Sequence, residues 1–187
     1  MAYLYLDDSK HQSFGFSLAA FVMCDADPTH EVELIFRRRG FDPNTFEFKS
    51  SARMKDDINL QKLRSALKTY IGRRCKIAVC VVDGDKRLGP AALRLLDRAL
   101  AHPYLARRQH QVFFDEGLFP STEAAENLVQ DTEKFKSCEF HFEQDSRRVL
   151  GMVLSDKFEP VSARAGTLPL ISCKDRATRR EPWRGSV

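Results

Sequence analysis

The spacing of apolar residues changes part-way along this chain, and that change constrains the fold more than any other feature. Before residue 40, three apolar-rich runs at residues 2–7, 14–23 and 31–37 predict extended strands. The stretches between them contain Asp, Ser and Pro, which are typical of turns. Because connections this short favour antiparallel neighbours, we expect the three runs to form an antiparallel meander.

After residue 57 the chain alternates between helical and strand patterns. Apolar residues at spacings of three and four predict an amphipathic helix over 57–73. Further helices are expected over 90–101, 121–135 and 147–158, and strands over 76–85, 111–117 and 138–146. The near-continuous apolar run KIAVCVV is typical of a parallel strand covered on both faces. The predicted fold class is therefore α/β, with a three-strand meander followed by parallel strands in one mixed sheet and helices packed on it.

Length and composition indicate one globular domain. The chain has 187 residues, of which 43% are hydrophobic and 30% charged, so it is long enough to bury a core and too apolar to be disordered. No apolar stretch approaches the ~18–20 residues of a membrane helix, and no signal-peptide pattern opens the sequence, so we expect a cytoplasmic protein. The five cysteines lack paired CxxC spacing, which indicates reduced thiols and neither a zinc site nor a disulfide framework.

The hydrophobic pattern fades near the C-terminus, which predicts a domain over residues 1–157 and a loosely ordered extension over 158–187. From residue 157 onward the chain holds seven of its 30 basic residues and three of its 26 acidic residues, so the part before it holds 23 of each. The domain is thus close to neutral and the extension basic. Arginine patches at 37–39 and 107–108 fit either solvated loop ends or local contacts with a polyanion.

Acidic residues fall where the predicted strands end. Asp7, Asp83 and Asp115 close their apolar runs, and Asp145 follows the last one. In a sheet of parallel strands the carboxyl ends share one edge, where such folds place their sites. Carboxylate oxygens bind Mg²⁺, and two such ions ~3.5–4 Å apart assist phosphodiester hydrolysis. The pattern therefore predicts a metal site at this edge.

Turn formation is the alternative explanation for these aspartates. Asp83 and Asp145 precede Gly and Ser and fit turns comfortably. Asp7 and Asp115 fit that explanation less well, because each lies on an apolar strand where an uncompensated carboxylate is costly. Clustered acids also repel one another and need a cation to offset their charge.

The opening YLYLDDS resembles the Y-[IL]-D-E-S opening of a bacterial and phage family, domain of unknown function family 3800. Further similar stretches follow in the family's order: FGFSLAAFVM, FEFKSSARMK, VFFDEG and QDSRRVLGMVLSD. The resemblance covers about residues 2–156. It implies an RNase-H-like fold and a phage or mobile-element context.

Carried over position by position, the resemblance implies a set of metal ligands: Asp7, Glu47, Asp115 and Asp156. Asp8 stands where the family usually has Glu and is a further candidate ligand. Lys49 follows Glu47 by two residues and would either contact a phosphate or neutralise that carboxylate, although a plain surface lysine fits equally well.

We therefore expect a Mg²⁺- or Mn²⁺-dependent nuclease with DNA or RNA as its partner. In this hypothesis Asp7 bridges the two ions, Glu47 and Asp115 complete their ligand shells, and Asp156 holds the second ion. Because the metal activates the attacking water, no protein nucleophile is needed, and no GxSxG, HxxxH or phosphate-loop pattern occurs. The alternative is a catalytically degenerate RNase-H-like domain that binds protein or nucleic acid. The abrupt change after Lys157, where the family's last helix continues, favours that alternative.

Overall fold

The computed structural model describes residues 1–11, 15–48, 57–83, 88–130, 132–144 and 149–155. At its centre is a five-stranded sheet: β1 (Ala2–His11), β2 (Phe16–Cys24), β3 (Cys75–Asp83), β4 (His110–Asp115) and β5 (Cys138–Gln144). The strands lie in the order β3-β2-β1-β4-β5. β2 runs antiparallel to β1 and β3, whereas β1, β4 and β5 run parallel to one another. The predicted fold class, an α/β mixed sheet with helices packed on it, is confirmed.

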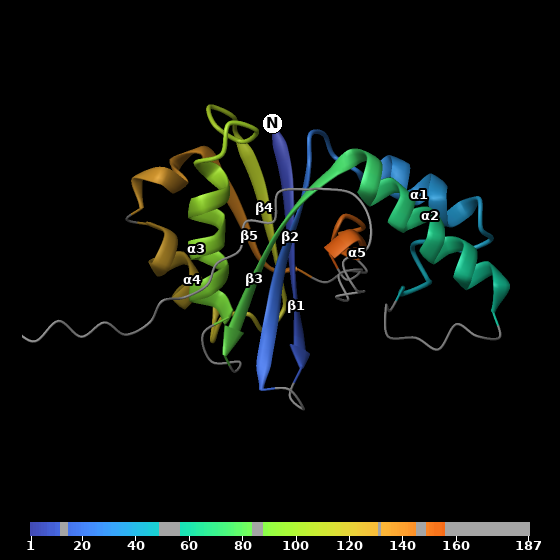
Figure 1. Cartoon of the computed structure of the whole chain (residues 1–187), viewed down its shortest axis with the longest axis horizontal. Coiled ribbons are helices and arrows are strands. Elements are labelled where there is room, and N and C mark those ends of the chain that lie inside the picture. The colour runs from blue at the N-terminus through green and yellow to red at the C-terminus, as the bar shows by residue number, and fades with distance from the viewer. Residues whose placement is uncertain (12–14, 49–56, 84–87, 131, 145–148, 156–187) are drawn as a thin grey trace, which may run out of the picture.

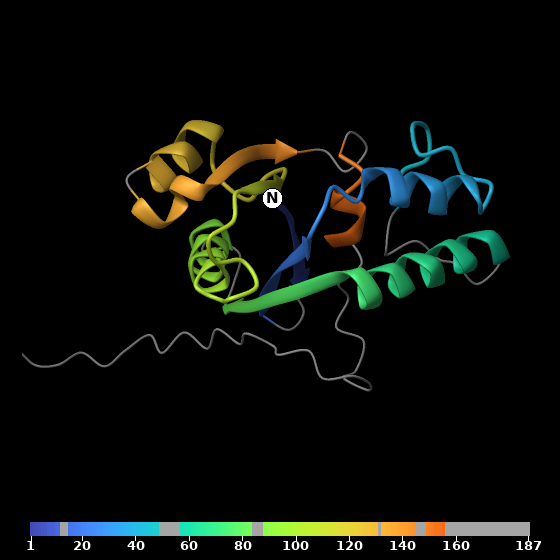
Figure 2. The same ribbon diagram turned by 90° about the horizontal axis from the view of Figure 1, so that it is seen from above.

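Helices cover both faces of the sheet (Figures 1 and 2). One face carries α3 (Leu88–Leu100), α4 (Thr122–Gln130) and the 3₁₀ helix η2 (Glu133–Ser137). The other face carries α1 (Thr29–Arg37), α2 (Ile58–Arg74) and α5 (Met152–Ser155). This three-layer arrangement buries the central strands on both sides, which explains why β1 and β2 are so rich in apolar residues.

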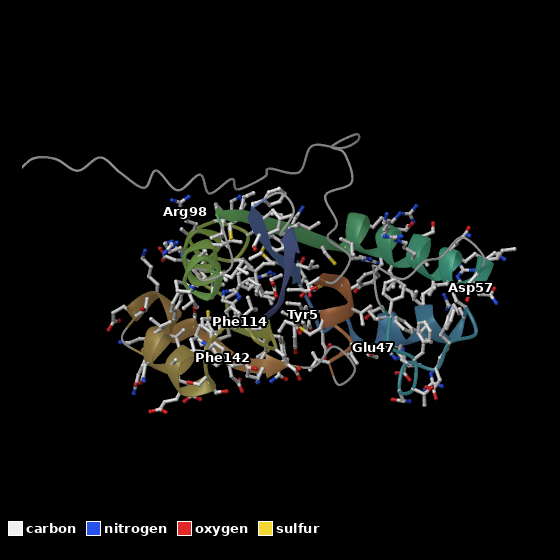
Figure 3. All side chains as sticks on the ribbon, turned by 90° about the horizontal axis from the view of Figure 1, so that it is seen from below. Tyr5, Glu47, Asp57, Arg98, Phe114 and Phe142 are labelled. Carbon is white, nitrogen blue, oxygen red and sulfur yellow. The ribbon has the colours of Figure 1, made fainter. Side chains whose placement is uncertain are left out.

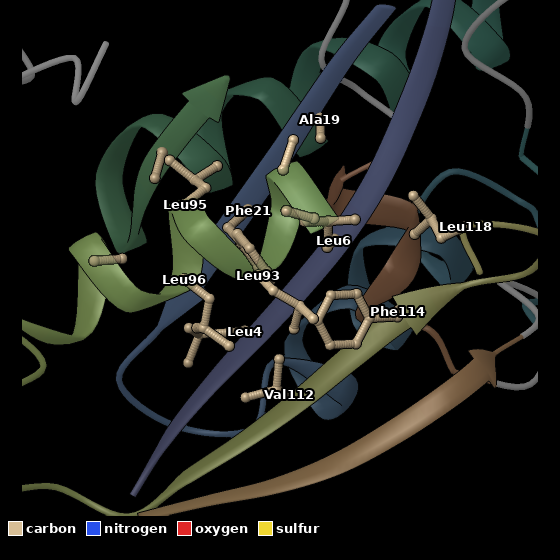
Figure 4. Packing of buried hydrophobic residues seen from close by; sticks show 14 of the residues in the cluster. Leu4, Leu6, Ala19, Phe21, Leu93, Leu95, Leu96, Val112, Phe114 and Leu118 are labelled. Carbon is tan, nitrogen blue, oxygen red and sulfur yellow. The ribbon is translucent and has the colours of Figure 1, made fainter. Parts of the chain in front are cut away.

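Each face of the sheet has its own apolar core. The α3-side core joins Leu6 of β1 to Phe114 of β4 and Leu96 of α3 (Figure 4). The α2-side core joins Tyr5 of β1 to Leu63 of α2 and to the residues of α5. Because successive side chains of a strand point to opposite faces, neighbouring residues of β1 belong to different cores.

Residues 31–37 form most of helix α1, so the prediction of a third strand there is wrong. The run EVELIFR alternates, but it also places Val32 and Phe36 four residues apart, and both are buried in the α2-side core. Glu33 and Arg37 lie one helical turn apart and form an ion pair of 2.7 Å. The four-residue spacing therefore decides the local structure.

The third antiparallel strand is β3, for which the sequence predicts a parallel strand covered on both faces. That prediction is also wrong, because β3 pairs antiparallel with β2 and forms one edge of the described sheet. Ala78, Cys80 and Val82 enter the α3-side core, whereas Val81 on the opposite face is 54% exposed. The apolar run therefore marks an edge strand with only part of its second face covered.

The helices expected over 57–73 and 90–101 form close to their predicted positions, as α2 and α3. The helix expected over 147–158 is described only as the four-residue α5, and residues 149–151 before it are not helical. α2 begins after Asp57, whose side chain accepts a hydrogen bond of 2.9 Å from the Leu60 N–H. α4 begins after Ser121, whose Oγ accepts one of 3.1 Å from the Ala124 N–H. α4 ends at Gln130, short of the predicted residue 135, and η2 follows.

Within the described ranges no helix has the length and apolarity needed to cross a membrane. The predicted domain boundary near residue 157 lies outside the described residues.

Candidate metal centre

Asp7 and Asp8 lie inside β1, which continues to His11, so the prediction that the strand ends at Asp7 is wrong. The parallel pairing of β1 with β4 does end there, because its last register pair is Leu6 with Phe114. Asp7 and Asp115 each follow that last pair by one residue. The two carboxylates therefore extend from neighbouring parallel strands at the point where their ladder stops.

Three carboxylates meet at this point. One ligand oxygen each from Asp7, Asp8 and Asp115 can be chosen so that all three lie within 4.8 Å of one another. All three residues are half-buried. The Asp8 backbone N–H donates to Asp7 Oδ1 at 2.7 Å, which helps to fix the Asp7 carboxylate on the strand. The structure thus brings together three of the five predicted ligands.

Burial of Asp115 disfavours its charged form and raises the pKa of its carboxyl group above the ordinary value. The negative charges of Asp8 and Glu116 raise this pKa further, while hydrogen bonds to the Asp7 side chain and to the Glu116 backbone oppose the shift. A divalent cation among these groups would offset the repulsion. Carboxylates alone form a hard oxygen donor set, which fits Mg²⁺ or Mn²⁺.

A row of stacked rings supports the acidic cluster from within the sheet. Tyr5 stacks on Phe113 with ring centroids 4.9 Å apart, and Phe113 stacks on His141 of β5 at 4.6 Å. Tyr5 and Phe113 precede Asp7 and Asp115 by two residues, so each ring shares a face of the sheet with the acid that follows it. The rings therefore fix the spacing and direction of the strands immediately before the carboxylates.

Helix α5 approaches this row very closely. Gly151 directly precedes α5, and a Cβ atom at this residue would lie 2.1 Å from Cζ of Tyr5. Tyr5 is only 1% exposed, and burial raises the pKa of its hydroxyl. Only glycine lets the chain pack against the ring at this distance. This contact was not predicted from the sequence, although the glycine within the apolar run VLGMVL was a usable signal.

A β-bulge changes the register of β5 beside the cluster. Phe113 pairs with His141 but Asp115 pairs with Gln144, so β5 contains one extra residue in this interval. Glu143 adopts a left-handed backbone conformation with φ of 55°, and its Oε2 accepts a hydrogen bond of 3.2 Å from the Gly117 N–H. This contact anchors the turn that follows Asp115. Nothing in the alternating sequence CEFHFEQ predicts the bulge.

The other predicted site residues are not brought into this cluster by the described structure. Glu47 is exposed and lies outside the group of three, on the side of the sheet that carries α1, α2 and α5 (Figure 3). Its neighbour Phe48 is 2% exposed and belongs to the α2-side core. Asp156, Lys49 and Asp145 lie outside the described residues, as does the side chain of Asp83.

Comparison of the chain with protein-family models and with curated proteins gives no match. The resemblance to domain of unknown function family 3800 therefore stays a prediction.

Proposed function

We propose that this protein is a divalent-metal-dependent nuclease whose cation is held by Asp7, Asp8 and Asp115. One observation carries the proposal: three half-buried carboxylates from two parallel strands lie within 4.8 Å of one another. A bound Mg²⁺ or Mn²⁺ would supply Lewis-acid activation of water and would neutralise charge on a phosphodiester. The chemistry does not require a nucleophilic side chain.

The protein's own residues would act by orientation. Asp7 and Asp115 directly follow the last register pair of β1 and β4 and are supported by the Tyr5–Phe113 stack, so their separation is set by the sheet. All three residues are only half-buried, so they are partly accessible to solvent. Asp156 is the further ligand that the family resemblance implies. A rigid, pre-positioned ligand set lowers the reorganisation that accompanies reaction.

Thermal melting with and without Mn²⁺ tests the metal site. Mn²⁺ should raise the melting temperature of the native protein and should leave Asp115→Asn unchanged. Glu126→Gln is the matched control, because Glu126 is an exposed acid on α4 away from the cluster, and this variant should respond like the native protein. Equal Mn²⁺ responses in the native protein and Asp115→Asn would exclude the cluster as the binding site.

Cleavage assays test the activity itself. Single-stranded and double-stranded DNA, RNA and an RNA–DNA hybrid are incubated with the native protein in Mn²⁺, and a chelator should abolish any cleavage. Asp7→Asn and Asp115→Asn should lose at least about 100-fold in rate, since each removes a metal ligand. Cleavage that survives both substitutions would contradict the proposal.

A non-catalytic binding domain is the second candidate, and the exposure of Glu47 favours it. That side chain is exposed and is not one of the three carboxylates that lie within 4.8 Å of one another in the described structure. Under this alternative the protein would bind a nucleic acid or protein without cleaving any of the four substrates. A gel-shift measurement on the uncleaved substrates, with and without Mn²⁺, separates the two candidates.

A further inference from the structure

Two cysteines, Cys24 and Cys75, flank the segment between β2 and β3 that contains α1 and α2, here called the α1–α2 segment. β2 ends at Cys24 and β3 begins at Cys75, and the chain between them leaves the sheet to form both helices. The two cysteines are register partners in the antiparallel β2–β3 ladder. The α1–α2 segment therefore begins and ends at residues that lie directly opposite each other in the sheet.

The two thiols are in contact. Their Sγ atoms lie 3.4 Å apart, and the residues are 2% and 4% exposed within the α2-side core. Opposed residues of an antiparallel pair have Cα atoms ~4.5–5.5 Å apart, which falls in the range that disulfides span. Bond formation thus needs only a small movement of two side chains.

We propose that Cys24 and Cys75 are a redox modification site, which a low-molecular-weight disulfide converts from a dithiol to a cross-strand disulfide. One cysteine, as its thiolate, attacks the small disulfide and releases one reduced thiol. The second cysteine thiolate then displaces the other half, so that one protein disulfide forms and the small disulfide is reduced to two thiols. The two protons of the cysteines end on the released thiols.

The Cys24 thiol is protonated at neutral pH. The hydrogen bond with Cys75 and burial raise the pKa of Cys24 far above its ordinary value. Exchange therefore requires transient opening of the strand pair, and β3 is an edge strand of the described sheet. Oxidation should be slow in the folded protein and faster during refolding.

A disulfide between Cys24 and Cys75 would covalently link the two ends of the α1–α2 segment at the sheet. The two cysteines are 51 residues apart in the chain, and closing a loop of that length restricts the unfolded state considerably. The melting temperature should rise by about 5–10 °C on oxidation and fall back on reduction.

The experiment counts free thiols. The native protein is equilibrated in excess oxidised glutathione, both folded and during refolding from denaturant, and is then alkylated after unfolding. The reduced protein should take up five maleimides, one per cysteine, and the oxidised protein three. Its mass before alkylation should be lower by about 2 Da. Peptide mapping should identify one link, between Cys24 and Cys75.

Two variants give the controls. Cys80→Ala removes another buried cysteine of β3 and should still form the link. The double variant Cys24→Ala/Cys75→Ala should take up three maleimides before and after oxidation. If that variant does not fold, mapping of the native protein decides alone. Five free thiols after refolding in oxidised glutathione, a link between other cysteines, or an unchanged melting temperature would each overturn the proposal.

Discussion

At the residue scale, Asp115 is held where its charge is disfavoured. Its raised pKa means that the fold favours the protonated acid. The stability that Asp115 contributes is therefore complete below its ordinary pKa of 3.8 and is lost as the pH rises through the raised value. At neutral pH without a cation, the carboxylate costs stability that a bound cation would restore.

Asp115→Asn should accordingly stabilise the metal-free protein at pH 7. We expect a melting temperature higher by about 2–4 °C, which corresponds to about 1 kcal/mol for a chain of this size. The advantage should shrink as the pH is lowered toward 4, where the native carboxyl takes up a proton. Thermal melting across this pH range in metal-free buffer measures both effects. A variant that melts below the native protein at pH 7 would contradict this account.

His110 is a second residue whose protonation matters to the fold. It is 2% exposed at the start of β4, and its Nδ1 has no hydrogen-bond partner in the part of the chain that the structure describes. Burial lowers its pKa, and the charges of the N-terminal amine and Arg108 lower it further, while a hydrogen bond to the Leu105 backbone opposes them. The neutral imidazole is therefore the form that fits.

The stability contributed by neutral His110 is present above the ordinary pKa of 6.5 and is lost as the pH falls below it. Between pH 7.5 and 5 the melting temperature of the native protein should fall more steeply than that of His110→Asn. His30→Asn, which changes an exposed histidine, should keep the native slope. Equal slopes for the native protein and His110→Asn would show that His110 does not titrate with folding.

At the scale of elements, the approach of α5 to β1 depends on Gly151. Where the backbone conformation allows it, Gly→Ala restricts the unfolded chain and stabilises a protein by about 0.4–1 kcal/mol. Packing predicts the opposite here, because the new methyl group would lie 2.1 Å from a buried ring. Overpacking of this kind costs about 1–3 kcal/mol, so the packing effect should prevail.

Gly151→Ala should therefore lower the free energy of unfolding by about 1–3 kcal/mol in urea titrations. Gly72→Ala is the matched control, because Gly72 lies within α2 and a Cβ atom there meets nothing within 4 Å. That control should be neutral or up to about 1 kcal/mol more stable. A stabilised Gly151→Ala would mean that α5 and Tyr5 separate readily.

The sequence predicts those elements that are specified by residues within the element itself. It fails where contacts between residues distant in the chain determine the structure. α2 was predictable because its apolar spacing and its Asp57 cap lie within the helix itself. Residues 31–37 satisfy both a two-residue and a four-residue period, and only burial of Phe36 against the α2-side core selects the helix. The direction of β3 depends on its pairing with β2, which no local pattern contains.

The same distinction holds for the candidate site. The proximity of Asp7 and Asp115 was predictable, because each follows an apolar run on one of two parallel strands, although β1 itself continues to His11. The Gly151 contact and the bulge at Glu143 were not, since each joins residues that are remote in sequence or breaks the alternation. Glu47 follows α1 in an irregular segment, whose course no periodic pattern fixes.

At the scale of the whole molecule, the two apolar cores share one sheet. Leu6 and Tyr5 are adjacent in β1 but enter different cores. Unfolding of β1 would therefore expose both cores. This arrangement predicts one cooperative unfolding transition, although the helical layers lie on opposite faces (Figure 2). The α1–α2 layer is the part most able to unfold separately, because both helices belong to one continuous segment between β2 and β3.

Leu63→Ala in α2 and Leu96→Ala in α3 test this coupling, since both side chains are fully buried. Each should cost about 2–4 kcal/mol and lower the melting temperature by about 5–12 °C. Circular dichroism, which follows all the helices, and hydrogen exchange of β3 should report the same midpoint in each variant. Leu128→Ala is the control, because Leu128 is 49% exposed and its loss should cost less than about 0.5 kcal/mol. A separate, earlier transition in Leu63→Ala would show that the α1–α2 layer unfolds independently and that the shared strands do not couple the two cores.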